Sequence, residues 1–167
     1  MNKTNLSKVA LCFDLDGTLA DLYGVPNWLE QLKAENTQPY EQAKPLVNMQ
    51  KLNEELKALQ AQGAKVIILS WLAKESTKEY EKQVRRAKKE WCKYYNIPFD
   101  EIHCRTYGTP KQQMYKASKY ELSLLFDDDK NVRENFLRPC KNRFAFSPSD
   151  IFNCLRNANG ILTTNTI

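Results

Sequence analysis

The sequence predicts an α/β fold, in which helices cover both faces of a parallel β-sheet. Short apolar runs alternate with longer helical segments along the chain, and two of these runs are followed directly by aspartates, at 13–16 and 126–129. The carboxyl ends of parallel strands meet at one edge of such a sheet, which is where open α/β folds bind their ligands. We therefore expect a single domain over residues 1–167 with its site at that edge.

The individual elements follow from local pattern. Strands are expected at 9–14, 65–70, 101–106, 122–127 and 142–146. Helices are expected at 26–35, 48–62, 73–95, 110–118, 130–136 and 148–157. The helix at 48–62 is the best defined, because its leucines have helical spacing and Gly63 follows it.

Composition indicates a soluble, cytoplasmic protein with no membrane partner. No run of apolar residues is long enough to span a bilayer, and the first eight residues are too polar for a secretory signal. The five cysteines are scattered and form no Cys-x-x-Cys pair, so neither a disulfide framework nor a zinc site is expected.

Asp14 and Asp16 follow the first apolar run, precede Gly17, and lie on the same side of the chain. They could simply form a turn, since Asp and Gly are common turn residues. The second acidic cluster, at 127–129, favours a functional site instead. Carboxylates from two strand ends repel one another unless a hard cation such as Mg²⁺ is bound between them.

The segment PheAspLeuAspGlyThrLeu at 13–19 resembles the first motif of the haloacid dehalogenase-like hydrolases, most of which are Mg²⁺-dependent phosphatases. The resemblance implies a Rossmann-like, doubly wound sheet. It also implies that Asp14 attacks phosphorus to give an aspartyl-phosphate, while Asp16 protonates the leaving oxygen and later activates water. A metal ion and a lysine would neutralise the phosphoryl oxygens.

The second and third motifs of that family have candidates in the expected order. Ser70 ends the strand at 65–70, and its hydroxyl could donate to a phosphoryl oxygen or cap the next helix. Lys111 begins the predicted helix after Pro110 and is the preferred lysine for the substrate phosphate. Lys116 and Lys119 are its competitors on the same helix.

The acidic cluster at 127–129 matches the fourth motif. By this resemblance, Asp128 joins Asp14 and Asp16 as a metal ligand, and Asp127 is a second carboxylate in the surrounding shell. Three consecutive acids leave this register open by one residue. Asn131 is expected to cap the following helix or to orient a ligand.

The chain between the first two motifs includes an insertion at about 20–47. In the resembled family such insertions form a flap or cap over the site, and this short one predicts a small helical lid. Its aromatic residues could stack on a nucleobase or pack the lid against the domain: Tyr23, Trp28 and Tyr40.

Charge adds one further observation. The net charge is +5, and residues 82–89 form a basic block that could attract phosphorylated substrates or nucleic acid. Glutamates at 75, 79, 81 and 90 interleave with this block. Their spacing favours a solvated helix with paired charges over a nucleic-acid groove.

Together these features predict a Mg²⁺-dependent phosphatase that hydrolyses a small phosphomonoester, such as a nucleotide. The GlyThrProLys and PheAspAspAsp segments are similar to those of short-capped 5′(3′)-deoxyribonucleotidase-like members of the family. Alternatives are a nucleic-acid 3′-end phosphatase and a non-catalytic binding protein with the same fold. The presence of both first-motif acids argues against the non-catalytic alternative.

Overall fold

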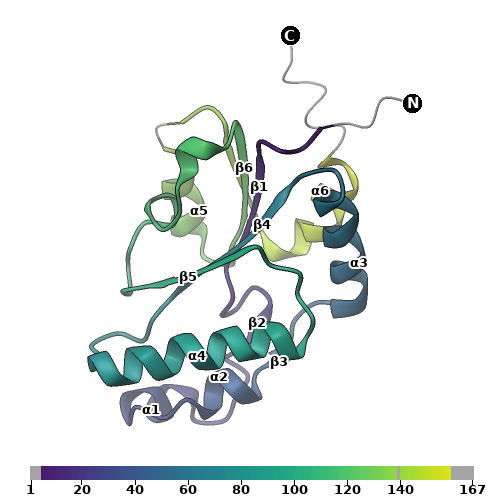
Figure 1. The fold of residues 1–167 in the computed structure, drawn as a ribbon. Helices are drawn as coiled ribbons and strands as arrows, with labels where there is room; N and C mark the ends of the chain where they lie inside the picture. Colours follow the sequence, from purple (N-terminus) through teal and green to yellow (C-terminus); the bar gives the residue numbers. More distant parts are fainter. Residues whose placement is uncertain (1–4, 139, 159–167) are drawn as a thin grey trace.

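The computed structural model describes residues 5–138 and 140–158, which contain a five-stranded parallel sheet in the order β5-β4-β1-β6-β7 (Figure 1). Every neighbouring pair in it is parallel. The predicted α/β, Rossmann-like fold is therefore confirmed. The strands have these bounds: β1 Val9–Phe13, β4 Lys65–Trp71, β5 Glu101–Arg105, β6 Leu122–Phe126 and β7 Arg143–Phe146.

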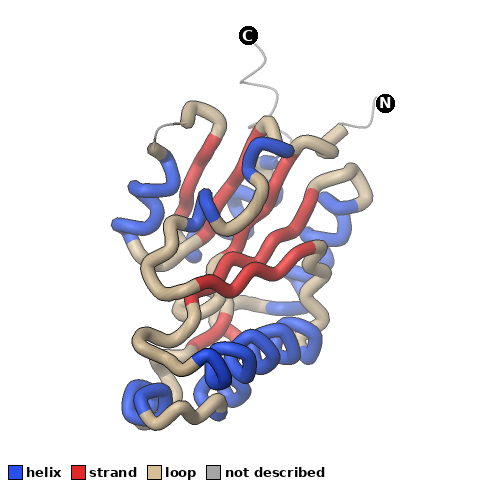
Figure 2. The backbone as a smooth tube through the Cα atoms, turned by 60° about the vertical axis from the view of Figure 1, so that its left-hand side comes forward, coloured by secondary structure: helices blue, strands red, loops and turns tan. Residues whose placement is uncertain are grey.

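Helices cover both faces of the sheet, as the tube view shows (Figure 2). Alternate side chains of β1 point to opposite faces because successive residues of a strand alternate. Leu11 and Phe13 pack in the cluster that includes residues of α3 (Met49–Gln60) and α6 (Ile151–Arg156). Ala10 and Cys12 pack on the other face with a residue of α5 (Lys130–Leu137). Both faces of β1 are thus buried, which explains its continuous apolar sequence.

Side-chain caps define where the helices begin. Asn48 accepts a hydrogen bond from the Lys51 backbone N at 3.0 Å and caps α3. Thr77 caps α4 (Lys78–Tyr94) in the same way, so this helix begins five residues later than expected. Ser70 lies within β4 and caps no helix, which removes the capping alternative for this residue.

The insertion packs against α4. Its two short strands, β2 (Ala20–Asp21) and β3 (Lys44–Pro45), pair antiparallel, and its helices are α1 (Trp28–Lys33) and α2 (Gln38–Gln42). Figure 1 shows α1 and α2 beside α4, beyond one end of the sheet. Two hydrogen bonds of 2.8 Å, from Tyr80 Oη to the Asn36 carbonyl and from Trp91 Nε1 to the Ala43 carbonyl, join the insertion to this helix.

The helix predicted at 110–118 is wrong. The structure has two 3₁₀ turns instead, Lys111–Gln113 and Ala117–Lys119. Met114 and Tyr115 between them are buried against the sheet, and this tertiary packing outweighs local helix propensity. The helix predicted at 148–157 likewise begins with a 3₁₀ turn, Pro148–Asp150, before α6.

Two expectations from composition can be compared directly with the structure. All five cysteines are free. Within 5–138 and 140–158, no helix combines the length and the apolar character needed to cross a membrane.

Candidate active site

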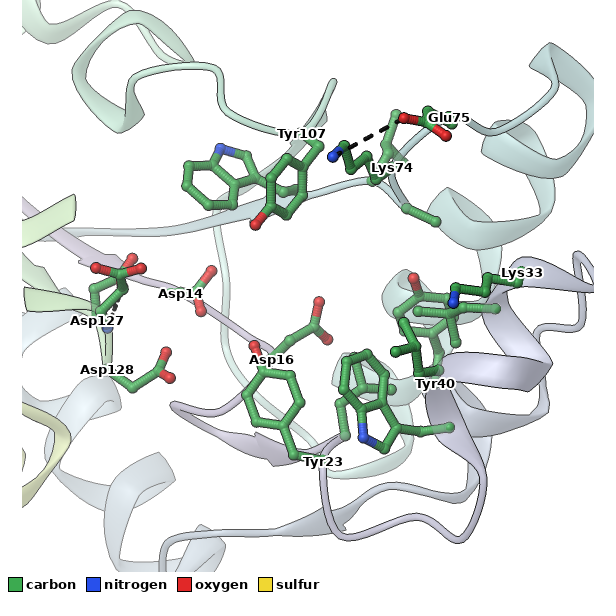
Figure 3. Close-up of a pocket in the computed structure, with 18 of the residues that line it drawn as sticks. Asp14, Asp16, Tyr23, Lys33, Tyr40, Lys74, Glu75, Tyr107, Asp127 and Asp128 are labelled. Carbon is green, nitrogen blue, oxygen red and sulfur yellow. Dashed lines mark hydrogen bonds and ion pairs between the residues drawn. The ribbon is translucent and has the colours of Figure 1, made fainter. Parts of the chain in front are cut away.

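Three aspartates from two adjacent strand ends lie together. Asp14 follows β1, and Asp127 and Asp128 follow β6, the parallel neighbour of β1 (Figure 3). Each contributes one carboxylate oxygen to a group whose members all lie within 4.8 Å of one another. Clustered carboxylate oxygens of this kind are the ligands that Mg²⁺ prefers in proteins.

Asp127 has a buried carboxylate oxygen that lacks a hydrogen-bond donor. Its Oδ1 accepts from the Asp129 backbone N at 3.0 Å, whereas Oδ2 has no hydrogen-bond partner within residues 5–138 and 140–158 and lies 3.6 Å from Lys111 Nζ. Burial, followed by repulsion from Asp14, raises the pKa of Asp127 to about 7. A buried oxygen without a donor fits the role of a cation ligand, so the donor set suits a divalent ion. Asp127 was expected in the shell around the metal ligands, but it belongs to the clustered group itself, together with Asp14 and Asp128.

Gly17 and Thr18 hold the first motif close to Asp128. Thr18 Oγ1 lies 3.4 Å from Asp14 Oδ2 and 3.3 Å from Asp128 Oδ1, and it accepts a hydrogen bond from the Asp128 backbone N at 3.1 Å. Gly17 has a φ of 82°, and a Cβ there would lie 2.6 Å from both Asp128 Oδ2 and the Tyr23 ring. Local sequence shows Gly17 and Thr18 only as part of the first motif, whereas in the structure Thr18 bridges Asp14 and Asp128.

Lys111 is the lysine that the fold brings to Asp14. Its ammonium is buried and donates to Asp14 Oδ1 at 2.5 Å and to the Leu69 carbonyl at 2.7 Å. Burial lowers the pKa of Lys111, but the charges of Asp14 and Asp127 outweigh this effect and raise it above its ordinary value. The competing lysines at 116 and 119 are exposed on the following turns.

Asp16 has a different partner from Asp14. Its Oδ2 accepts a hydrogen bond from Nζ of Lys88 on α4, which also donates to Ser70 Oγ and to the Trp71 carbonyl, each at 2.7 Å. Burial raises the pKa of Asp16, and Asp14 adds to this effect while Lys88 opposes it. The Asp16 carboxylate lies outside the clustered group that Asp14 forms. Ser70 is fully buried and does not line the pocket, so the structure does not bring its hydroxyl to the position expected for a phosphate ligand.

Lys88 was missed in the sequence, where it was grouped with the basic block at 82–89. A signal was present, because Lys88 lies on the helical face that Tyr80, Val84 and Trp91 define. All of these residues are buried. A lysine in the apolar stripe of an amphipathic helix indicates a buried ammonium with a specific partner.

The structure also distinguishes the roles of the three consecutive acids at 127–129. Asp129 caps α5, because its Oδ1 accepts from the backbone N atoms of Asn131 and Val132 at 2.7 and 3.3 Å. The expectation that Asn131 caps this helix is therefore wrong. Arg133 donates from Nη1 to the carbonyls of Asp127 and Asp128 at 2.7 and 2.8 Å and so holds the loop that presents the two acids.

A pocket of about 460 Å³ opens above the acids and continues between aromatic side chains. Tyr23 and Tyr107 are 51% and 55% exposed, and Figure 3 shows them on opposite sides of Asp16. Trp28 and the buried Tyr40 also line the pocket. Tyr40 packs in the cluster that joins the insertion to α4, whereas Tyr23 has a ring surface open to a ligand.

No protein-family model and no curated protein sequence matches this chain. Among solved structures, it is similar to a chain of the Pnkp1/Rnl/Hen1 RNA repair complex, with 22% sequence identity and a TM-score of 0.55. The similarity covers 84% of this chain but 42% of the other, so this chain spans less than half the length of that neighbour. At this identity the comparison establishes a common fold.

Proposed function

We propose that this protein is a Mg²⁺-dependent phosphomonoester hydrolase that acts through an aspartyl-phosphate on Asp14. The observation that carries the proposal is the placement of Asp14. Its carboxylate belongs to the clustered group with Asp127 and Asp128 and also accepts a hydrogen bond from buried Lys111. A carboxylate that lines an open pocket and is held by a buried ammonium is positioned to act as a nucleophile toward phosphorus.

In the first step, an Asp14 oxygen attacks phosphorus while the bond between phosphorus and the leaving oxygen breaks. Asp16 lines the same pocket and gives its proton to that oxygen. In the second step, Asp16 takes a proton from water as the water oxygen attacks phosphorus. The bond between phosphorus and Asp14 then breaks, and inorganic phosphate leaves with Asp14 regenerated.

The balance of charges around Asp14 and Asp16 favours the binding of a divalent cation. Four carboxylates face two ammonium groups when all are ionised: Asp14, Asp16, Asp127 and Asp128 against Lys88 and Lys111. This leaves an excess of two negative charges, which would repel a phosphate ester. Mg²⁺ held by Asp14, Asp127 and Asp128 would cancel this excess and supply a Lewis acid for the phosphoryl oxygens.

The volume and the aromatic lining of the pocket favour a substrate with a flat leaving group, such as a nucleotide. A volume of about 460 Å³ is in the range of small-ligand sites. The half-exposed rings of Tyr23 and Tyr107 offer stacking surfaces above the acids, and ring stacking tolerates any base.

The second candidate is a phosphatase for nucleic-acid ends, which would use the same chemistry. It is favoured by the common fold with a chain from an RNA repair complex. The net charge of +5 is compatible with an extended anionic substrate.

A phosphate-release assay tests the function. We expect Mg²⁺-dependent release from nucleoside monophosphates, none with excess EDTA, and none from Asp14→Asn. A panel of nucleoside monophosphates, sugar phosphates and 3′-phosphorylated oligonucleotides separates the substrate candidates, since an end phosphatase favours the oligonucleotides. Absence of release from the whole panel with Mg²⁺ present would contradict the enzymatic function.

A further inference from the structure

Lys88 is a fully buried lysine on a helix whose other basic residues are solvated. Its exposed fraction is 0%, whereas its neighbour Lys89 is exposed. Removing an ammonium group from water carries a large free-energy cost unless hydrogen bonds and opposite charge compensate for it. The contacts of Lys88 therefore indicate why the charge is placed there.

All three protons of the Lys88 ammonium have acceptors. They go to Asp16 Oδ2, to Ser70 Oγ and to the Trp71 carbonyl, and the ring of Tyr40 lies 4.7 Å from Nζ. These partners come from the first motif, the end of β4 and α2 of the insertion. One ammonium thus connects the three parts of the fold that surround Asp16.

The contact to Asp16 involves only one of its two carboxylate oxygens. Oδ1 forms no hydrogen bond with any residue in the described ranges, and Asp16 lines the pocket with its side chain 17% exposed. Lys88 itself does not line the pocket. The ammonium lies behind the carboxylate, where it restricts rotation of Asp16 and leaves one oxygen open to the pocket.

We propose that Lys88 is a positioning residue that holds Asp16 by Oδ2 and directs Oδ1 toward the leaving oxygen of the substrate. This inference rests on the proposed phosphatase function and specifies how its acid is placed. Lys88 acts through Asp16 and has no contact with the phosphoryl group. Its contribution therefore depends on how much the leaving group needs a proton, because correct placement of an acid matters only when a proton must be transferred.

The test compares two esters of similar shape, phenyl phosphate and 2,4-dinitrophenyl phosphate, with Mg²⁺ present. Phenolate is a poor leaving group that needs a proton, whereas dinitrophenolate leaves without one. In Lys88→Met we expect kcat/KM for phenyl phosphate to fall by at least about tenfold, and kcat/KM for dinitrophenyl phosphate to fall by less than about threefold. Equal losses for the two esters, or no loss for either, would overturn the proposal.

A double-mutant cycle provides the second readout. Because Lys88 acts through Asp16, adding Lys88→Met to Asp16→Asn should change kcat/KM by no more than about twofold. The proposal would be overturned if Lys88→Met lowered kcat/KM in the Asp16→Asn background by as much as it does in the wild-type background. Lys89→Met makes the same substitution at the next, exposed position, and we expect it to retain wild-type rates on both esters.

Folding is checked by circular dichroism and urea unfolding. If Lys88→Met does not fold, Lys88→Gln retains a hydrogen-bond donor of similar length, and the same ester ratio decides the outcome. If the wild-type protein with Mg²⁺ releases phosphate from neither ester and from no substrate of the panel described above, the proposed function fails and this inference fails with it. An active wild-type enzyme with a uniform loss in the lysine variant overturns the inference alone.

Discussion

The two acids of the first motif have different buried lysine partners, and the two pairs differ in what else they contact. Lys111, which follows β5, holds Asp14 and lies 3.6 Å from Asp127 Oδ2, and it lines the pocket. Lys88, from α4, holds Asp16 together with Ser70 and does not line the pocket. The Lys111 ammonium is therefore next to the space where a ligand would bind, whereas the Lys88 ammonium contacts the side chains of Asp16 and Ser70 and the Trp71 carbonyl. Under the proposed function, the Lys111 pair would stabilise charge on the reacting group, and the Lys88 pair would place the proton carrier Asp16.

The largest expected effect separates the two acids. Asp14→Asn should lower turnover by at least about a thousandfold and abolish the phosphoenzyme, because no carboxylate oxygen remains to attack phosphorus. Asp16→Asn should still form the phosphoenzyme from dinitrophenyl phosphate and then accumulate it, because the base for hydrolysis is missing. Acid-quench trapping of ³²P on the protein checks both variants. A trapped phosphoenzyme in Asp14→Asn would assign the nucleophile to another residue.

The next effect separates the two lysines. Lys111→Met should lower kcat/KM by about 10²–10³-fold on every ester, whatever its leaving group, because charge on the phosphoryl group is present in all of them. Lys88→Met should show the leaving-group dependence described above. Steady-state rates on the phenyl and dinitrophenyl esters measure the difference. The same leaving-group dependence in both lysine variants would remove the distinction between the two pairs.

A smaller effect is expected at Gly17, which follows Asp16 in the first motif and lies against Asp128. Gly17→Ala places a Cβ 2.6 Å from Asp128 Oδ2 at a φ of 82° and should lower the free energy of unfolding by about 1–3 kcal/mol. Gly108→Ala is the matched control, because Gly108 has a φ of 85° and nothing within 4 Å of an added Cβ. Urea unfolding and Mg²⁺ titration compare the two variants. Similar losses of Mg²⁺ affinity in both would show that the contact with Asp128 has no effect on the site.

The smallest expected effect is a pH dependence of stability. It arises from Asp127, which lies next to Lys111. Burial and the charge of Asp14 raise the pKa of Asp127 from 3.8 to about 7. The metal-free fold binds more protons than the unfolded chain between these values, so its stability falls as pH rises from about 4 to about 7. In the proposed site Mg²⁺ would bind the ionised carboxylate, so it should raise Tm by several degrees at pH 8 and by less at pH 5.5.

Scanning calorimetry with Mg²⁺ or EDTA at the two pH values measures this difference. Asp127→Asn is the control, since it removes the titrating carboxylate and should remove the pH dependence of the Mg²⁺ effect. An equal Tm increase at both pH values in the wild-type protein would contradict the assignment of Asp127 to the cation site.

Much of the framework could be predicted from local pattern. The apolar runs predicted all five strands of the main sheet, and the predicted strand ends place Asp14 beside Asp127 and Asp128. This worked because strand burial and the parallel arrangement are properties of short segments and their order along the chain. The helix at 110–118 failed because buried contacts of Met114 and Tyr115 with the sheet outweigh the local propensity of that segment.

The sequence by itself determined the fold class, the edge of the sheet that bears the acids and the identity of the first-motif carboxylates. Only the tertiary structure decided that Lys88 is buried, that its partner is Asp16, that Ser70 is buried and does not line the pocket, and that Asp129 caps α5. Lys88 and Asp16 are 72 positions apart in the chain. No local pattern specifies a contact of that range, because it depends on how a helix face and a strand end pack together and on which charges that packing removes from water.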